Sequence, residues 1–235
     1  MRRAALVVVL ALTGPGVGAC MGDIDPPWQL DHDRIVAVRA NPPGITSGQS
    51  SAIDALLGSK GKMTSVATPE LARVVSPASL SDVLSSNAGR WLVTAPDETR
   101  LAAARRELAL AAGVPVPLQI SVSYAGQSLV ATKTVVLGQA ADNPPIDGKI
   151  AIDGKPPGDA ELVVGKLVKV PLSIDVDDAA CDVAWLTTCG TMHDFDLPQA
   201  YLKVEVDDPA AGELAVVVRD AHGGVSWQLW SIHAE

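Results

Sequence analysis

Strict alternation of apolar and polar residues, the pattern of a strand with one solvent-exposed face, marks the second half of the chain. It is clearest over Leu172 to Val176 and Leu202 to Val206, where aliphatic side chains alternate with serine, lysine and acidic residues. Two further apolar runs flank His222-Gly223-Gly224, which predicts a terminal hairpin. We therefore expect the second half to be built almost entirely from β-strands.

The first half opens with the same order of features. A strand is predicted from Ile35 to a break at Pro42-Pro43-Gly44, and Gly48 precedes a second strand at residues 51–57. The second half repeats this order, and each half ends in a hairpin pattern. The repeated features are Ile150 to Gly158, Gly165 and Leu172 to Val176. This order predicts an internal repeat of one fold.

The first half also carries a helical insertion. Thr94-Ala95-Pro96-Asp97 is a capping pattern, and it opens a predicted helix that runs to about Ala112. Leu101, Ala104 and Leu108 fall on one face of that helix. Between residues 57 and 94 we expect loops and short helical turns, because serine, glycine and proline are frequent there.

These features resemble immunoglobulin-like domains, in which an edge strand, a proline break and a glycine turn often come first. Trp185 and the segment from Val217 to Trp227 resemble bacterial immunoglobulin-like and polycystic-kidney-disease-type domains, with a mid-strand tryptophan and a V-x-D-x-x-G-G hairpin. The fold class is therefore expected to be mainly β, two immunoglobulin-like β-sandwiches in tandem. We place a signal peptide at residues 1–19, a lipidated tether at 20–33, domains at 34–138 and 146–235, and a linker at 139–145.

The N-terminus has the features of a secretory signal. Arg2 and Arg3 precede a nine-residue apolar run from Ala4 to Leu12, and spanning a bilayer takes about 20 residues. The segment Val17-Gly18-Ala19-Cys20 then resembles the lipobox of bacterial lipoproteins. This resemblance implies a palmitate-bearing anchor at Cys20, and Met21 after the cysteine, rather than aspartate, favours the outer membrane. The alternative is an ordinary secreted protein with a chance cysteine.

Cys181 and Cys189 form an even pair in an oxidising compartment, which predicts one disulfide. Bridged Cα atoms lie within about 7 Å. The segment between them is therefore expected to turn back near Leu186 to Thr188 instead of forming one straight strand.

Charge is divided unevenly along the chain. Residues 33–137 hold ten basic against seven acidic residues, whereas residues 146–235 hold six against sixteen. An acidic second half disfavours nucleic acid as a partner. Calcium is a candidate ligand because acidic loops supply hard oxygen atoms, and ordinary surface acidity is the alternative. The candidate ligands are Asp175, Asp177, Asp178, Asp182, Asp194 and Asp196.

The sequence contains no G-x-S-x-G, Walker, H-E-x-x-H or G-x-G-x-x-G motif. Cys189, Met192 and His193 suit copper only if a second histidine joins them. Trp227 and Trp230 fall on opposite faces of their strand, so we expect one of them to be exposed. The sequence predicts a non-catalytic accessory lipoprotein that binds another envelope protein. The alternatives are a ligand- or calcium-binding module and, third, an envelope hydrolase.

Overall fold

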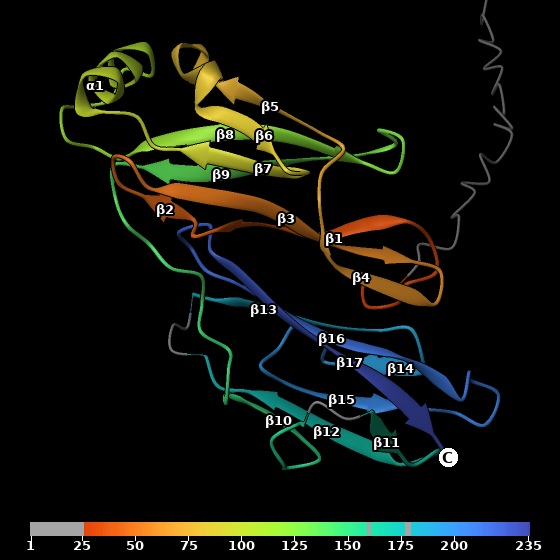
Figure 1. Ribbon diagram of the computed structural model, residues 1–235. Helices are drawn as coiled ribbons and strands as arrows, with labels where there is room; N and C mark the ends of the chain where they lie inside the picture. Colours follow the sequence, from red (N-terminus) through yellow and green to blue (C-terminus); the bar gives the residue numbers. More distant parts are fainter. Residues whose placement is uncertain (1–25, 159–160, 177–179) are drawn as a thin grey trace, which may run out of the picture.

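The computed structural model describes residues 26–158, 161–176 and 180–235 (Figure 1). The chain is mainly β, and four sheets form two sandwiches in tandem, so the predicted fold class is confirmed. No helix in the described part of the chain is long and apolar enough to cross a bilayer. The lipobox residues, including Cys20, lie outside the described residues.

Sandwich 1 pairs one sheet of order β1-β3-β7-β6, with β4 added beside β3, and one of order β2-β9-β8-β5. Its strands are β1 (Arg34–Asn41), β2 (Gly44–Ile45), β3 (Ser50–Ser59), β4 (Lys62–Ala67), β5 (Leu71–Ser76), β6 (Leu84–Asn87), β7 (Arg90–Thr94), β8 (Val116–Tyr124) and β9 (Leu129–Leu137).

Sandwich 2 pairs a sheet of order β10-β12-β15-β14 with one of order β11-β17-β16-β13. Its strands are β10 (Ile150–Ile152), β11 (Leu162–Val164), β12 (Lys169–Ile174), β13 (Asp182–Thr187), β14 (Thr191–His193), β15 (Gln199–Lys203), β16 (Ala211–Arg219) and β17 (Val225–Ala234).

Both sandwiches have the same strand order. If β4 is set aside, each places its first, third, sixth and fifth strands in one sheet and the remaining strands in the other. The short second strand, β2 or β11, runs parallel to the last strand of its sandwich. This is the A-B-E-D and C-F-G arrangement of immunoglobulin domains. The repeat read from the sequence is therefore a repeat of topology.

The region between residues 57 and 94 contains more strand than predicted. One short helical turn is present, the 3₁₀ helix η1 (Ala78–Val83), but β4, β5, β6 and β7 account for most of the segment. Strands β4 and β6 bury almost none of their side chains, so their sequences carry little apolar periodicity. Backbone pairing with β3 and β7 stabilises them instead.

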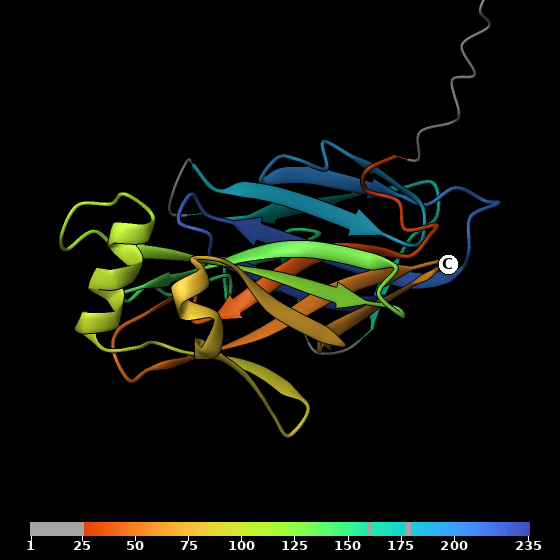
Figure 2. The same ribbon diagram turned by 90° about the horizontal axis from the view of Figure 1, so that it is seen from above.

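The predicted helix is present but shorter, as α1 (Glu98–Glu107) at one end of sandwich 1 (Figure 2). Asp97, not Thr94, is its cap, because the Asp97 side chain accepts a hydrogen bond from the Arg100 amide at 3.0 Å. The helix ends before Ala112 since Ala109 adopts a positive φ. Leu101 and Ala104 are buried as predicted.

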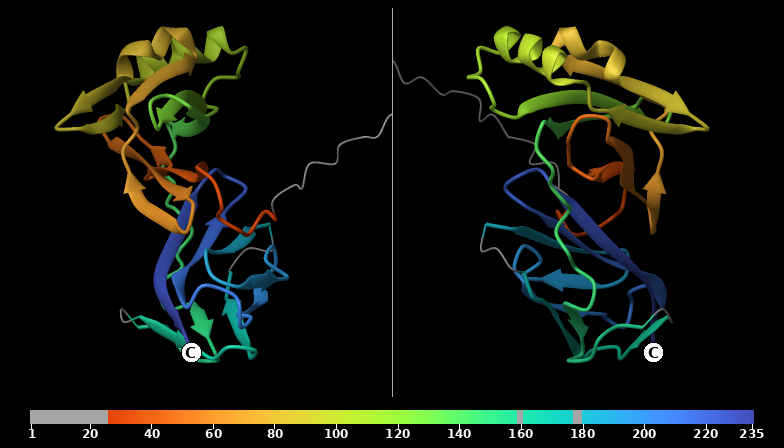
Figure 3. Two further views of the ribbon diagram at one scale, coloured as in Figure 1. Left: turned by 90° about the vertical axis from the view of Figure 1, so that its right-hand side faces the viewer. Right: turned by 60° about the vertical axis from the view of Figure 1, so that its left-hand side comes forward.

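The two sandwiches pack face to face through a third apolar core, which we call the joint (Figures 1 and 3). The outer face of the β13-β16-β17 sheet lies against β1, β3 and β4 of sandwich 1. Both faces of β16 are therefore covered, and residues 214–218 are all buried. The joint consists of Leu30, Ala37, Leu56, Met63, Leu186, Ala215, Val217, Val225 and Trp227.

The joint corrects the prediction for the two tryptophans of β17. They do lie on opposite faces, with Trp230 in the core of sandwich 2 and Trp227 in the joint. Neither is exposed: Trp227 retains only 8% of its accessible surface and Trp230 only 5%. The face expected to be wet is covered by the other sandwich.

The segment predicted as a tether is docked from residue 26 onward. The Thr187 amide donates to the Trp28 carbonyl at 3.0 Å, and the Gly61 amide donates to the Leu30 carbonyl at 3.2 Å. The Leu30 side chain is buried in the joint. Residues 26–30 therefore bind both sandwiches instead of hanging between an anchor and the first strand.

The structure also corrects the predicted disulfide. The residues between Cys181 and Cys189 do not turn back, because β13 pairs with β16 in unbroken register from Asp182 to Thr187. Six residues of strand extend about 20 Å, so the two cysteines lie at opposite ends of β13 and do not bond to each other. The buried Cys189 thiol contacts the Pro209 carbonyl at 2.8 Å instead, and burial raises its pKa.

Candidate interaction surface

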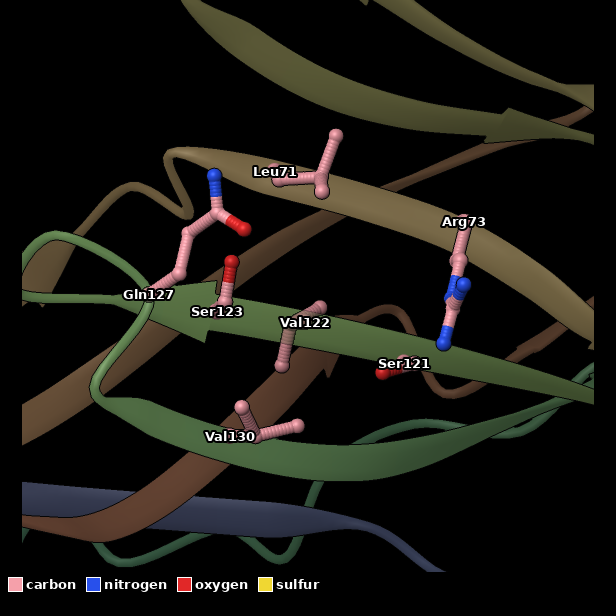
Figure 4. Close-up of a pocket in the computed structure, with 7 residues that line it drawn as sticks. All are labelled: Leu71, Arg73, Ser121, Val122, Ser123, Gln127 and Val130. Carbon is pink, nitrogen blue, oxygen red and sulfur yellow. The ribbon is translucent and has the colours of Figure 1, made fainter.

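The outer face of the β2-β9-β8-β5 sheet in sandwich 1 is open to solvent, and we call it the open face. Across three neighbouring strands, Leu71, Ser123 and Val130 stand in one row (Figure 4). The next row holds Arg73 and Ser121. Leu71 is 44% exposed and Val130 is 63% exposed, so the open face presents large apolar side chains to water.

Ser123 lies between the two exposed apolar residues and lines a shallow depression of about 180 Å³. Its side chain is only 6% exposed, yet its hydroxyl has no hydrogen-bond partner within the described ranges. Leaving a buried hydroxyl unsatisfied costs about 1–3 kcal/mol. A ligand group that hydrogen-bonds Ser123 would recover part of this cost.

Arg73 supplies the charge of the open face. Its side chain is exposed, and no carboxylate of the described residues forms an ion pair with it. The strand that carries it, β5, lies at the edge of its sheet. The open face is thus an apolar, serine-lined surface beside one unpaired guanidinium.

Local sequence explains how the open face is positioned. The turn between β8 and β9 has positive φ at Ala125, Gly126 and Gln127, and the Gly126 amide donates to the Glu70 carboxylate at 3.0 Å. This contact ties the β8–β9 turn to the start of β5. The sequence predicted the β8–β9 hairpin but not β5, so Leu71 and Arg73 were missed. The β5 sequence Leu71-Ala72-Arg73-Val74-Val75-Ser76 is apolar on both faces apart from Arg73 and Ser76, so it lacks the alternation that marks a strand with one wet face.

In the joint, unlike on the open face, the polar side chains around the buried tryptophan have hydrogen-bond partners. Arg39 donates to both carboxylate oxygens of Asp54, at 2.8 and 3.0 Å, while its guanidinium carbon lies 4.1 Å from the Trp227 ring centroid. The Trp227 indole nitrogen donates to the Ser65 hydroxyl at 3.0 Å. Polar groups of sandwich 1 therefore surround an aromatic ring of sandwich 2.

Asn143 extends these contacts into the predicted linker. Its amide nitrogen donates to the Ala40 carbonyl at 3.1 Å, and its amide oxygen accepts from the Val225 backbone at 2.8 Å. One side chain thus joins both sandwiches. Together with the buried joint, this contact gives the two sandwiches a defined relative position.

The signal for the joint was present in the sequence. Leu214-Ala215-Val216-Val217-Val218 is a continuous apolar run, whereas a strand with one wet face alternates. Such a run is typical of a strand covered on both faces. The run predicts a strand of the terminal hairpin, and the structure buries both of its faces.

The candidate calcium ligands are only partly described. Asp177 and Asp178 lie outside the described residues. Among the described residues, no three His, Cys, Asp or Glu side chains gather closely enough to hold a metal ion. Asp175 follows β12 and Asp182 begins β13, while Asp194 and Asp196 lie between β14 and β15. The calcium site stays a prediction.

The strand order defines the class of this protein as a mainly β chain of two immunoglobulin-like sandwiches. No family model matches the chain, and no curated protein matches it. Solved structures that it resembles include the N-terminal Ig1-2 module of the Drosophila receptor protein tyrosine phosphatase DLAR, 10% identical with a TM-score of 0.30, covering 87% of this chain and 99% of that one.

Two other solved structures resemble the chain to a similar degree. Murine CEACAM1b is 12% identical with a TM-score of 0.28, covering 85% of this chain and all of that one. The fibronectin(III)-like modules of Clostridium thermocellum CbhA are also 12% identical with a TM-score of 0.28, covering 85% of this chain and 94% of that one. Because these TM-scores are low, the fold is assigned from the strand order and register of the two sandwiches.

Proposed function

We propose that this protein is a lipid-anchored, non-catalytic accessory protein of the bacterial cell envelope, which holds another envelope protein near the membrane through the open face. Three features support this proposal. They are the lipobox-like segment Val17 to Cys20, the defined joint between the sandwiches, and the open face itself. We further propose the outer membrane as its location, because Met21 and Gly22 follow the cysteine.

The main support for the proposal is a difference between the two sandwiches. In sandwich 2, the outer face of the β11-β17-β16-β13 sheet is covered, and Ala215, Val217 and Trp227 are buried there by sandwich 1. In sandwich 1, the corresponding face is uncovered and exposes Leu71 and Val130. The same sheet is thus a packing surface in one repeat and open in the other. We infer that a protein partner covers it in the complex.

The anchor would hold the whole molecule close to the bilayer. Only five residues separate Cys20 from Pro26, where the docked segment begins, and the six Cα–Cα steps between the two span about 20 Å when extended. A partner bound to the open face would therefore be kept near the membrane surface.

The anchor is tested by Cys20→Ala. We expect the wild-type protein to be recovered in the membrane fraction with an acylated Cys20 as its first residue, as measured by mass spectrometry. The variant should carry no acyl chain, and molecules from which the leader has been removed should leave the membrane fraction. An unmodified Cys20 thiol in mature wild-type protein would contradict the anchor without bearing on the open face.

The open face is tested by Val130→Asp, with Val163→Asp as a matched control. Both valines are 63% exposed, but Val163 lies on β11 of sandwich 2. A carboxylate at position 130 would be desolvated under an apolar partner, so we expect at least a tenfold loss of any stoichiometric partner that co-purifies from detergent-solubilised membranes. Val163→Asp should retain that partner. Equal retention by both variants would overturn the assignment of the open face.

A further inference from the structure

A second surface feature is a groove between the two sandwiches, which we call the joint groove. Strands β1 and β9 form one wall, and the end of β16 with its turn into β17 forms the other. Its volume is about 530 Å³, within the range of small-ligand sites. The charged residues of the lining are two cations, Lys133 of β9 and Arg219 of β16, and two carboxylates, Asp182 and Asp220.

Lys133 is an almost fully buried cation. Its side chain is 7% exposed, and its ammonium makes a single hydrogen bond, to the Gly223 carbonyl at 2.6 Å. An ammonium has three donors, so two of them have no protein acceptor in the described part of the chain. Burial lowers the pKa of Lys133 to about 8. Sandwich 1 thus places a poorly compensated charge against sandwich 2.

Arg219 brings a second charge to the same groove. It is half-buried, and its Nη2 donates to the Val36 carbonyl at 2.7 Å. Burial lowers its pKa as well. No carboxylate of the described residues lies within ion-pair distance of Arg219 or of Lys133.

The nearby carboxylates have other partners or face water. Asp220 Oδ1 accepts hydrogen bonds from the His222 and Gly224 amides at 2.8 and 2.7 Å, which holds this carboxylate within the β16–β17 turn. Asp54 is engaged by Arg39. Asp182 stands opposite Arg219 in the β13–β16 register but is exposed. These three residues attract the two cations at longer range only.

We propose that the joint groove binds an anionic oxygen group, either a carboxylate or a phosphate, against Lys133 and Arg219. A buried ammonium without a counter-charge is costly, and an anion bound beside it gains charge-assisted hydrogen bonds in a partly desolvated site. Gly223, whose carbonyl accepts the Lys133 hydrogen bond, itself lines the groove. The proposal does not depend on the lipid anchor or on a partner at the open face, although Val130 lines both surfaces.

The anion site is tested with the purified full-length protein by thermal unfolding at pH 7, in sodium phosphate, sodium acetate or sodium chloride of equal ionic strength. We expect phosphate or acetate to raise the Tm of the wild type above its value in chloride, because an anion that binds only the folded state stabilises it. Lys133→Met should lose this increase. Lys60→Met, an exposed lysine in the β3–β4 turn, should keep it.

The two salts distinguish the source of the anion. An increase with acetate indicates that the site accepts a carboxylate, and an increase with phosphate alone indicates that it requires a phosphate group. Arg219→Met provides a second variant, and backbone amide shifts of Gly223 and Val36 should move on titration with the same anion. An equal response in Lys133→Met and wild type, or no response to either anion, would overturn the proposal.

Discussion

Replacing Trp227 by alanine is expected to lower the free energy of unfolding by about 3–5 kcal/mol, the range for truncating a buried aromatic side chain. The indole is buried in the joint, stacks under the Arg39 guanidinium and donates to the Ser65 hydroxyl. All of these contacts join sandwich 2 to sandwich 1. We therefore expect the variant to unfold in two separated transitions, because the sandwiches lose most of their coupling.

Differential scanning calorimetry and urea denaturation would measure this effect. Trp91→Ala is the matched control, since Trp91 is partly buried within sandwich 1 and its indole donates to the Pro69 carbonyl at 2.9 Å. That variant should lose stability in sandwich 1 while the coupling between sandwiches persists. If Trp227→Ala costs no more than Trp91→Ala and the transitions stay coupled, the joint does not fix the two sandwiches.

How much of this fold can be read from the sequence depends on how each strand is buried. Strands with one wet face, such as β12, alternate visibly and were predicted. Strands β4 and β6 bury almost no side chains, so their pairing through backbone hydrogen bonds leaves little trace in the pattern. The repeated order of turns and strands predicted that one fold occurs twice, and the structure gives both sandwiches the same strand order.

The joint and the Cys181–Cys189 pair show the limit of that approach. An alternating pattern shows which residues are apolar, but it does not show which surface covers them. The spacing between Trp227 and Trp230 therefore does not predict that the other sandwich buries Trp227. The disulfide prediction assumed a turn near Leu186, but Leu186 packs in the joint and β13 pairs straight along β16. Tertiary packing decided both outcomes.

The sequence signals for the open face and for the joint groove differ in strength. Val130 stood in a predicted hairpin, although nothing local indicated that its face would stay uncovered. Lys133 carried a clearer signal, because it falls in line with Ala131, Val135 and Leu137, which point inward along β9. A lysine at an inward position of a strand indicates a burial that requires explanation.

Lys133→Met is expected to raise the free energy of unfolding at pH 7 by about 2 kcal/mol. The pKa of Lys133 is lowered from 10.5 to about 8 by burial, and each pKa unit corresponds to about 1.36 kcal/mol between the two protonation states. The lost hydrogen bond to Gly223 offsets about 1–1.5 kcal/mol of that gain. Methionine retains the apolar stem of the side chain and its packing.

The advantage of the variant should depend on pH in a defined direction. Because the folded pKa lies below the unfolded one, the folded wild type binds fewer protons between pH 8 and 10.5 than the unfolded chain does. The wild type therefore gains stability relative to Lys133→Met as pH rises through this window, and the difference is full below pH 8. Urea denaturation of both proteins from pH 6 to 10.5 would measure it, with Lys60→Met as the control that should show no such dependence. If the difference in unfolding free energy between the two proteins stays constant across that range, Lys133 is not a desolvated cation. The joint groove would then lack the buried positive charge on which the anion site depends.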